Sequence, residues 1–407
     1  MVNVIGLGYI GLPTALMMSS NGIEIIGTDY NRELVEMLNE GKTTFKEKGL
    51  DDLFASAVKA GIKFTTEYQI ADTYIISVPT PYDKKFKTVD ASYVVSAVKA
   101  VLNVAPVGAT IVVESTISPG TIDKYVRPAV EKQGFKIGTD IHLVHAPERI
   151  IPGNMIYELV HNNRTIGADK KEIGDKIAQL YASFCQGKIT VTSIRTAEMT
   201  KVVENTYRDI NIAYANELAK ICREGDMDVY EIIKIANQHP RVNILMPGPG
   251  VGGHCISVDP WFLVGDYPGL ANIILQARKI NDGMPRYVIH RISQIMKEEG
   301  LTDVRRVGLY GLTYKENVDD TRESPTLQML ERMEDALSGG LVQVYDPYIE
   351  KDIAPNQHHE LGSFLDSVDM VVIMVGHDEI KQNVEKLKNK VVFDTRNISY
   401  NEKWYTL

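Results

Sequence analysis

The sequence predicts an α/β protein with two doubly wound parallel sheets, joined by a long central helix and a helical middle domain. Three observations support this prediction. Short apolar runs alternate with amphipathic stretches up to about residue 194, the same alternation resumes after Gly300, and residues 196–224 contain neither Gly nor Pro. Alternation of this kind is typical of parallel sheets covered by helices on both faces. We therefore expect three domains, over residues 1–195, 196–299 and 300–407.

The first domain is expected to contain a sheet of buried strands. Its apolar runs are short and are bounded by turn residues, as buried strands are. Amphipathic stretches such as DASYVVSAVKAVLNV separate several of them and predict the covering helices. In chain order the runs are VNVIGLG at 2–8, EIIGTDY at 24–30, TYIISVPTP at 73–81, GATIVVEST at 108–116, IHLVHAPER at 141–149, NRTIGA at 163–168 and KITVTS at 188–193.

The middle domain is expected to be helical. One long helix over 196–224 ends at Gly225, more helix extends to about residue 238, and another helical run covers about 270–299. The last domain resumes the strand pattern, and a helix opens within it at Ser324 and Pro325. Its strand-like runs are RRVGLYG at 305–311, LVQVYDP at 341–347, DMVVIMVG at 369–376 and KVVFDTRN at 390–397.

Composition excludes several classes of protein. The formal net charge of -9 argues against a general nucleic-acid or anionic-membrane surface. The three cysteines are far apart and form no Cys-x-x-Cys pair, so we expect no disulfide framework and no metal site. No apolar run approaches the ~20 residues of a membrane span. The chain opens directly on a strand and a glycine turn rather than a signal peptide, so we expect a cytoplasmic protein.

A glycine motif indicates a nucleotide site in the first sheet. Gly6, Gly8 and Gly11 form G-x-G-x-x-G directly after a strand and at the start of a helix. Such glycines permit a tight turn and let a pyrophosphate approach the helix N-terminus. Asp29 ends the next strand, where a carboxylate binds ribose hydroxyls and repels a 2'-phosphate, so we expect a Rossmann-like domain that binds NAD. The alternative is a glycine turn that only packs a helix onto a strand.

Cys255 lies in a segment with unusually few side chains, GPGVGGHCISVDPWF at 248–262. Glycines allow a ligand to approach the backbone closely, and Asp259 follows four residues later. A lone cysteine is more often a small buried apolar residue than a nucleophile, and we accept that reading for Cys185 and Cys222. For Cys255 the residues alone leave both readings open.

The chain resembles the UDP-glucose/GDP-mannose dehydrogenase family over essentially its whole length. The motifs GLGYIGLP, VPTP, ESTISPGT, APER, AEMTKVVENTYR, GPGVGGHC, GLTYKENVDDTRESP and DTRN occur in the family's order. The resemblance implies a four-electron oxidation of a primary alcohol to a carboxylate with two NAD per sugar. It also implies a role for Cys255, whose thiolate would add to the intermediate aldehyde. The thiohemiacetal would then be oxidised to a thioester that water hydrolyses.

The resemblance further implies roles for individual residues. Lys201 and Asn205 lie four apart, hence on one face of the long helix, and would stabilise the alkoxide at C6. Asp259 would hold a water or the lysine and help in proton transfer. Thr116 would position the nicotinamide and Glu148 the hydrolytic water. Without the family, Lys201 would be read as a solvated helix lysine and Glu148 as a surface carboxylate.

The resemblance also implies two sets of ligand-binding residues. The substrate diphosphate needs fixed positive charge, which arginine supplies through its planar fork. Arg322 would instead reach the NAD. The cofactor set is Gly6, Gly8, Tyr9, Ile10, Gly11, Asp29, Pro79, Thr80, Thr116 and Arg322, and the substrate set is Glu148, Arg149, Lys201, Asn205, Arg241, Gly250, Gly252, Lys315 and Arg396.

The sugar is expected to be a UDP-N-acetylhexosamine. Ile256, Ser257 and Val258 separate Cys255 from Asp259, whereas the glucose enzymes commonly have Pro-Lys-Asp after one residue. By likeness we favour UDP-N-acetyl-D-mannosamine as the substrate, with UDP-N-acetylglucosamine as the nearest alternative. We expect the product to be used in surface polysaccharide. Two other hypotheses are a two-electron hydroxy acid dehydrogenase and a non-catalytic nucleotide sensor. We also expect a homodimer through the long helix.

Overall fold

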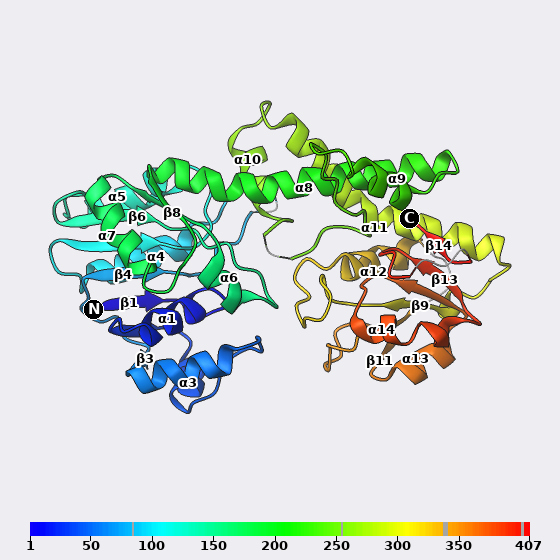
Figure 1. Cartoon of the computed structure of the whole chain (residues 1–407), viewed down its shortest axis with the longest axis horizontal. Helices are drawn as coiled ribbons and strands as arrows, with labels where there is room; N and C mark the ends of the chain where they lie inside the picture. The colour runs from blue at the N-terminus through cyan, green and yellow to red at the C-terminus, as the bar shows by residue number, and fades with distance from the viewer. Residues whose placement is uncertain (84, 254, 337–340, 400–402) are drawn as a thin grey trace. The chain divides into compact units, whose positions relative to one another are not determined.

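The computed structural model describes residues 1–83, 85–253, 255–336, 341–399 and 403–407 (Figure 1). The chain folds into two compact units, Met1–Glu204 and Asn205–Leu407. Each unit contains a sheet, so the predicted α/β class with two Rossmann-like sheets is confirmed. The predicted threefold division at residues 195 and 299 stays a prediction. No helix in the described part of the chain is both long and apolar enough to cross a membrane.

The first unit is built on a sheet in the order β3-β2-β1-β4-β5-β6-β7-β8. The order reverses between β1 and β4, which is where ligands bind in sheets of this kind. All neighbouring strands pair in parallel except β6 and β7, which are antiparallel. The strands are β1 (Val2–Ile5), β2 (Ile25–Thr28), β3 (Lys63–Thr65), β4 (Thr73–Ile76), β5 (Ala109–Val113), β6 (Ile141–His145), β7 (Arg164–Ala168) and β8 (Ile189–Thr192).

Helices cover both faces of the first sheet. Alternate residues of a strand point to opposite faces; thus Ile75 of β4 belongs to one apolar core and Tyr74 and Ile76 to the other. The first core is closed by α1, α2, α3, α6 and α7, and the second by α4, η1 and α5. The helices are α1 (Gly11–Ser20), α2 (Arg32–Asn39), α3 (Leu50–Ala60), α4 (Ser92–Leu102), η1 (Ile122–Val126), α5 (Arg127–Lys132), α6 (Met155–His161) and α7 (Lys171–Tyr181).

The second unit contains a parallel sheet in the order β11-β10-β9-β12-β13-β14. Its first strands in the chain repeat the order of the first sheet, so both sheets have the reversal point of a nucleotide-binding fold. Figure 1 draws the strands of this sheet in yellow to red. The strands are β9 (Val307–Tyr310), β10 (Gln343–Tyr345), β11 (Gln357–His358), β12 (Met370–Ile373), β13 (Val391–Asp394) and β14 (Tyr405–Thr406).

The helices of the second unit also lie on both faces of its sheet. Residues of α9, α11 and α12 enter one apolar core, and residues of α13, α14 and η3 enter the other. The helices are α9 (Val229–Ala236), α10 (Asp259–Asp266), α11 (Asn272–Glu298), η2 (Val304–Arg306), α12 (Pro325–Ala336), α13 (Leu361–Ser367), α14 (Asp378–Gln382) and η3 (Val384–Leu387).

The long helix predicted over 196–224 is α8 (Ile194–Glu224), which runs from the first unit into the second. It starts two residues early, and the Ala197 amide donates to the Ser193 carbonyl at its first turn. It ends as predicted before Gly225, but the left-handed residue that turns the chain is Asp226, with φ of 52°. A polar residue with local hydrogen-bonding capacity tolerates that conformation.

Candidate functional site

The glycine motif of the first unit forms a tight loop between β1 and α1. Gly6 has a φ of +88°, a conformation that glycine adopts without strain. A methyl group added to Gly11 would lie 1.9 Å from the Gly6 carbonyl oxygen, whereas one on Gly8 would meet nothing within 4 Å. The loop therefore needs Gly11 for its own packing and leaves open space at Gly8. This geometry fits a pyrophosphate bound at the helix N-terminus.

Asp29 directly follows β2 and holds the glycine loop in place. One of its carboxylate oxygens accepts from the Leu7 amide at 2.8 Å, and the other accepts from the Asn31 amide at 2.9 Å. The carboxylate thus stands beside the loop, as NAD binding requires. Two other members of the cofactor set, Tyr9 and Ile10, lie within the loop, and the Tyr9 ring packs 4.5 Å from the Phe45 ring.

Pro79, Thr80 and Thr116 follow neighbouring strands of the first sheet. The Thr80 hydroxyl donates to the Thr116 carbonyl at 2.7 Å, so the structure brings these two predicted residues together. The loop after Thr116 is held by Glu198, a residue of α8 that the sequence did not single out. Its carboxylate accepts from the Gly120 and Ile122 amides at 2.5 and 3.0 Å.

Glu148 follows β6 and is buried. One of its oxygens accepts from the Arg149 amide at 2.6 Å, and the other pairs with the Arg164 guanidinium. The Arg149 side chain donates to Glu204, to the Thr165 hydroxyl and to a backbone carbonyl, all within the first unit. Glu148 is thus not a solvated surface carboxylate.

Lys201 and Asn205 both lie on the buried face of α8. Lys201 is only 6% exposed, which rules out the alternative of a solvated helix lysine. The Asn205 amide donates to the Asp259 carboxylate at 2.6 Å, so these two predicted residues meet within the second unit. Burial of a lysine and of an aspartate is rare unless the groups serve pairing or chemistry.

Cys255 lies four residues before Asp259, the first residue of α10. Its carbonyl accepts from the Val258 and Asp259 amides at 3.1 and 2.8 Å, which winds the segment into a turn that leads into the helix. Cys255 is exposed, whereas Cys185 and Cys222 are buried as predicted. Exposure beside a helix start is the environment of a reactive rather than a structural cysteine.

The glycines before Cys255 pack against the segment that follows β9. A methyl group on Gly252 or Gly253 would lie 2.6 or 2.8 Å from the Tyr314 side chain, and one on Gly250 would lie 3.0 Å from Pro325. The Gly253 amide also donates to the Arg322 carbonyl at 2.8 Å. From the sequence we expected these glycines to let a ligand approach the backbone. The structure shows that they also allow close packing against Tyr314 and Pro325. Burial and the nearby Asp320 and Cys255 raise the pKa of Tyr314 to about 12.

A buried hydrogen-bond network within the second unit also contacts this loop, at Gly248. The Gly248 amide donates to Asn216 at 2.9 Å, and Asn216 donates to Asn281 at 2.9 Å. Asn281 donates to Asp209 at 2.8 Å, and Asp209 also accepts from Arg278 at 2.6 Å. This network was not predicted from the sequence, although Asp209 and Asn216 share the face of α8 that bears Asn205. A polar stripe on a buried helix face was the signal that could have revealed it.

The predicted cationic residues of the second unit differ in placement. Arg396 follows β13 and is exposed, and a methyl group on Gly248 would lie 2.6 Å from its guanidinium. Lys315 follows β9 and is half-buried, whereas Arg241 is exposed after α9. The Arg322 side chain pairs with Asp320, with contacts from 2.5 to 3.1 Å.

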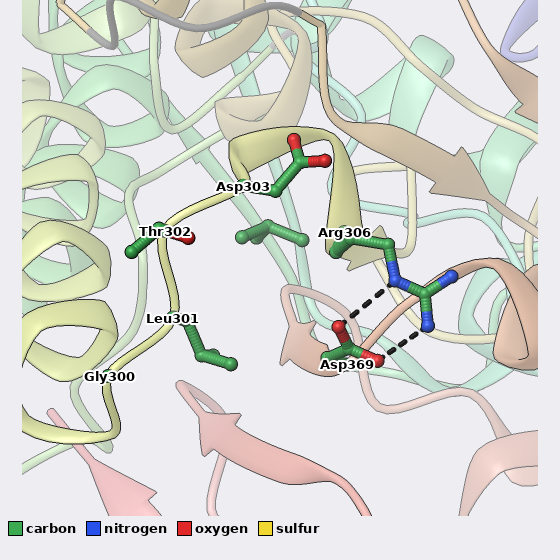
Figure 2. Close-up of a pocket in the computed structure, with 7 residues that line it drawn as sticks. Gly300, Leu301, Thr302, Asp303, Arg306 and Asp369 are labelled. Atoms are coloured by element: carbon green, nitrogen blue, oxygen red, sulfur yellow. Dashed lines mark hydrogen bonds and ion pairs between the residues drawn. The ribbon is translucent and has the colours of Figure 1, made fainter.

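A surface pocket lies at the opposite edge of the second sheet (Figure 2). Arg306 precedes β9 and Asp369 precedes β12, and the two side chains pair through contacts of 3.0 and 2.5 Å. The pocket therefore lies at the amino ends of these strands, away from the carboxyl edge where Lys315 and Arg396 follow their strands. Its lining residues are Gly300, Leu301, Thr302, Asp303, Arg306, Val307 and Asp369.

A glycine loop at the reversal point of the first sheet, and a second sheet with the same strand order, define a protein of the nucleotide-binding class. The chain belongs to the UDP-glucose/GDP-mannose dehydrogenase family. The family's NAD binding domain matches residues 1–185, its central domain residues 195–283 and its UDP binding domain residues 308–401. The protein is therefore an NAD-dependent oxidoreductase that acts on a UDP-sugar.

Individual relatives are similar over nearly the whole chain. A UDP-N-acetyl-D-mannosamine dehydrogenase of Methanocaldococcus jannaschii is 42% identical over 98% of this chain and 93% of its own length. An NDP-N-acetyl-D-galactosaminuronic acid dehydrogenase of Ralstonia nicotianae is 41% identical over 97% and 95%. The solved UDP-N-acetyl-mannosamine dehydrogenase of Staphylococcus aureus has a TM-score of 0.88 and 42% identity, covering 100% of this chain and 97% of that one.

Alanine substitutions at two of the three motif glycines, Gly8 and Gly11, are predicted to have different effects. Gly8→Ala should leave the free energy of unfolding within about 0.5 kcal/mol of wild type, because its methyl group meets nothing within 4 Å. It should nevertheless weaken NAD binding by about tenfold or more. Gly11→Ala should cost about 3 kcal/mol or more of stability through overpacking. Urea unfolding measures the stability of each variant, and NAD titration measures its affinity for NAD. Unchanged NAD affinity in Gly8→Ala would contradict the assignment of this loop to NAD binding.

Glu198 is predicted to make stability depend on pH. Burial raises the pKa of its carboxyl from 4.5 to about 7. Between those values the folded state keeps a proton that the unfolded state loses, so the free energy of unfolding falls as pH rises through about 7. Glu198→Gln should reduce that fall by up to ~3 kcal/mol, whereas Glu131→Gln on the surface should not. Urea unfolding at pH 5 and 8 measures the difference, and identical falls in both variants would refute the prediction.

Proposed function

We propose that the protein oxidises C6 of UDP-N-acetyl-D-mannosamine to a carboxylate in two NAD-dependent steps, through a thiohemiacetal and a thioester on Cys255. The proposal rests mainly on the exposure and the surroundings of Cys255. It is the exposed cysteine of the three, the glycines before it pack against Tyr314, and the Gly248 amide donates to Asn216. A two-electron hydroxy acid dehydrogenase or a nucleotide sensor would not need an exposed cysteine on such a loop.

NAD supplies the hydride acceptor in both oxidation steps. In the first step the C6 hydroxyl loses its proton, and Lys201 and Asn205 stabilise the alkoxide that develops there. Asp259 receives the hydrogen bond of Asn205, which fixes its carboxylate near the thiol loop. A carboxylate in that place can accept the proton. Thr116, held by Thr80, would line the nicotinamide site.

Cys255 then makes the second oxidation possible. Its thiolate adds to the aldehyde, and the resulting thiohemiacetal is the second hydride donor. Glu148 would orient the water that hydrolyses the thioester, releasing the carboxylate and the free thiol. The overall reaction consumes one alcohol, two NAD and one water, and it releases one carboxylate, two NADH and three protons.

The cationic and glycine-rich segments of the second unit would bind the UDP-sugar. Lys315 and Arg396 follow strands of the second sheet, where fixed charge can meet a diphosphate. The Arg322 side chain pairs with Asp320. A contact between Arg322 and NAD therefore stays a proposal. Arg149, Arg241, Gly250 and Gly252 complete the proposed substrate set.

The choice of sugar is supported by likeness. Some relatives that match nearly the whole chain are named for UDP-N-acetyl-D-mannosamine, and others are named for an NDP-N-acetyl-D-galactosaminuronic acid. UDP-N-acetylglucosamine is the other alternative. The enzyme would work in the cytoplasm, and its product would supply an aminouronic acid for surface polysaccharide.

We predict two NADH per sugar when limiting UDP-N-acetyl-D-mannosamine reacts with excess NAD. Cys255→Ala should lower carboxylate formation by about 10³-fold or more, because the thioester cannot form, while NAD affinity is unchanged. Cys222→Ala, which removes a buried thiol, is the matched control and should keep the ratio. A ratio of one would refute the thioester route, whereas turnover of another UDP-sugar alone would refute only the choice of sugar.

The protein is also proposed to form a homodimer through α8. Tyr207, Tyr214 and Ile221 are 59%, 53% and 52% exposed and follow one another at intervals of seven residues. A heptad spacing places them in one stripe along the helix, as in helices that pair with another helix. Large exposed apolar side chains in such a row are typical of an interaction surface.

The double variant Tyr207→Lys and Tyr214→Lys should dissociate this dimer. Like charges facing each other across a symmetric interface oppose association. Light scattering at micromolar concentration should give the mass of two chains for wild type and of one chain for the variant. Exposed Tyr157→Lys in the first unit serves as the control. A wild-type mass of one chain would contradict the proposal.

A further inference from the structure

A cluster of ionisable side chains is buried beneath the carboxyl edge of the first sheet. Glu114 follows β5, Glu148 follows β6, Arg164 begins β7 and Tyr181 ends α7. All four side chains are buried. The proposed function uses only Glu148 among them, so the remaining three need another explanation.

The antiparallel pairing of β6 and β7 brings Arg164 to Glu148. In this pairing Val144 faces Ala168 and His145 faces Gly167. Continued beyond the strand end, the same register places Glu148 opposite Arg164. The two side chains form an ion pair there. A parallel β7 would have carried its first residue to the other edge of the sheet.

Arg164 is held so that its guanidinium cannot turn away. It lies over the Tyr181 ring at 4.5 Å and the Phe184 ring at 5.3 Å. On one side it pairs with Glu148, and on the other a guanidinium nitrogen lies 3.9 Å from Glu114. Stacking on aromatic rings suits the planar guanidinium and not the lysine ammonium.

Glu114 is fixed by hydroxyl groups from three other elements. It accepts from Ser77 after β4 at 2.6 Å, from Tyr181 at 2.9 Å and from Thr14 of α1 at 3.5 Å. Two carboxyl groups thus face one guanidinium in a buried space. Burial and then the charge of Glu148 raise the pKa of Glu114 to about 7. A protonated Glu114 leaves the charge of Arg164 to Glu148 alone.

We propose that Arg164 is a positioning residue for thioester hydrolysis. Its ion pair with Glu148 fixes the Glu148 carboxylate, and Glu114 competes with Glu148 for the same guanidinium. This inference rests on the function proposed above. The water oxygen bonds to the thioester carbon and the carbon–sulfur bond breaks. One water proton ends on the Cys255 sulfur and the other leaves as the carboxylate ionises.

The test is rapid mixing of wild type, Arg164→Gln and Arg164→Lys with excess NAD and UDP-N-acetyl-D-mannosamine. Both hydride transfers precede hydrolysis, so the variants should keep a burst of two NADH per Cys255. The steady-state rate that follows should fall by about 10- to 100-fold. Hydroxylamine, which attacks thioesters directly, should restore turnover and form the hydroxamate. A merely structural defect would lower the burst and would not respond to hydroxylamine.

Controls separate this inference from the proposed function. Arg195→Gln removes an exposed arginine of the same unit and should change neither phase. Arg164→Gln leaves Glu148 buried without its partner and can fail to fold; Arg164→Lys keeps the charge and loses the planar fork. A wild-type ratio other than two NADH per sugar would overturn the proposed function. Normal hydrolysis in both Arg164 variants, with a wild-type ratio of two, would overturn only the positioning role.

Glu114→Gln provides a second, independent readout. It removes the group with the raised pKa while its amide can still bond to Ser77, Tyr181 and Thr14. In wild type the hydrolysis rate should change as pH rises through about 7, because an ionised Glu114 competes for Arg164. The variant should lose that inflection. An inflection that persists unchanged in Glu114→Gln would contradict the role of Glu114.

Discussion

The burial of polar side chains along one face of α8 is the constraint on which the functional loops depend. A buried polar group without a partner costs free energy, so each needs a hydrogen bond. Glu198 finds it on the loop after β5, Asn205 on the carboxylate of Asp259, and Asn216 on the amide of Gly248. The helix thereby fixes one loop in the first unit and the thiol-bearing loop in the second.

Backbone packing imposes a second constraint, and it acts on two different loops. In the first unit Gly11 lies against the carbonyl of Gly6, whereas a methyl group on Gly8 would meet nothing within 4 Å. In the second unit Gly252 and Gly253 lie against Tyr314. In both places a glycine is required because protein backbone or a ring occupies the position of a side chain.

Two buried carboxyl groups of the first unit titrate near neutral pH instead of near 4.5. Burial is the main cause for both Glu114 and Glu198. Each holds a segment at the carboxyl edge of the first sheet, where the cofactor and the hydrolytic water are proposed to bind. Perturbed carboxyl groups gather at functional sites because the arrangement that serves chemistry is seldom the arrangement that is most stable.

The sequence by itself determined the α/β class, the two Rossmann-like sheets and the extent of α8 to within two residues. These features follow from local periodicity and from turn residues, which act over a few neighbouring positions. The short strand β3, the antiparallel direction of β7 and the packing of Tyr314 were not predicted. Only the tertiary structure decided that Arg164 meets Glu148, because strand register depends on contacts between residues far apart in the chain.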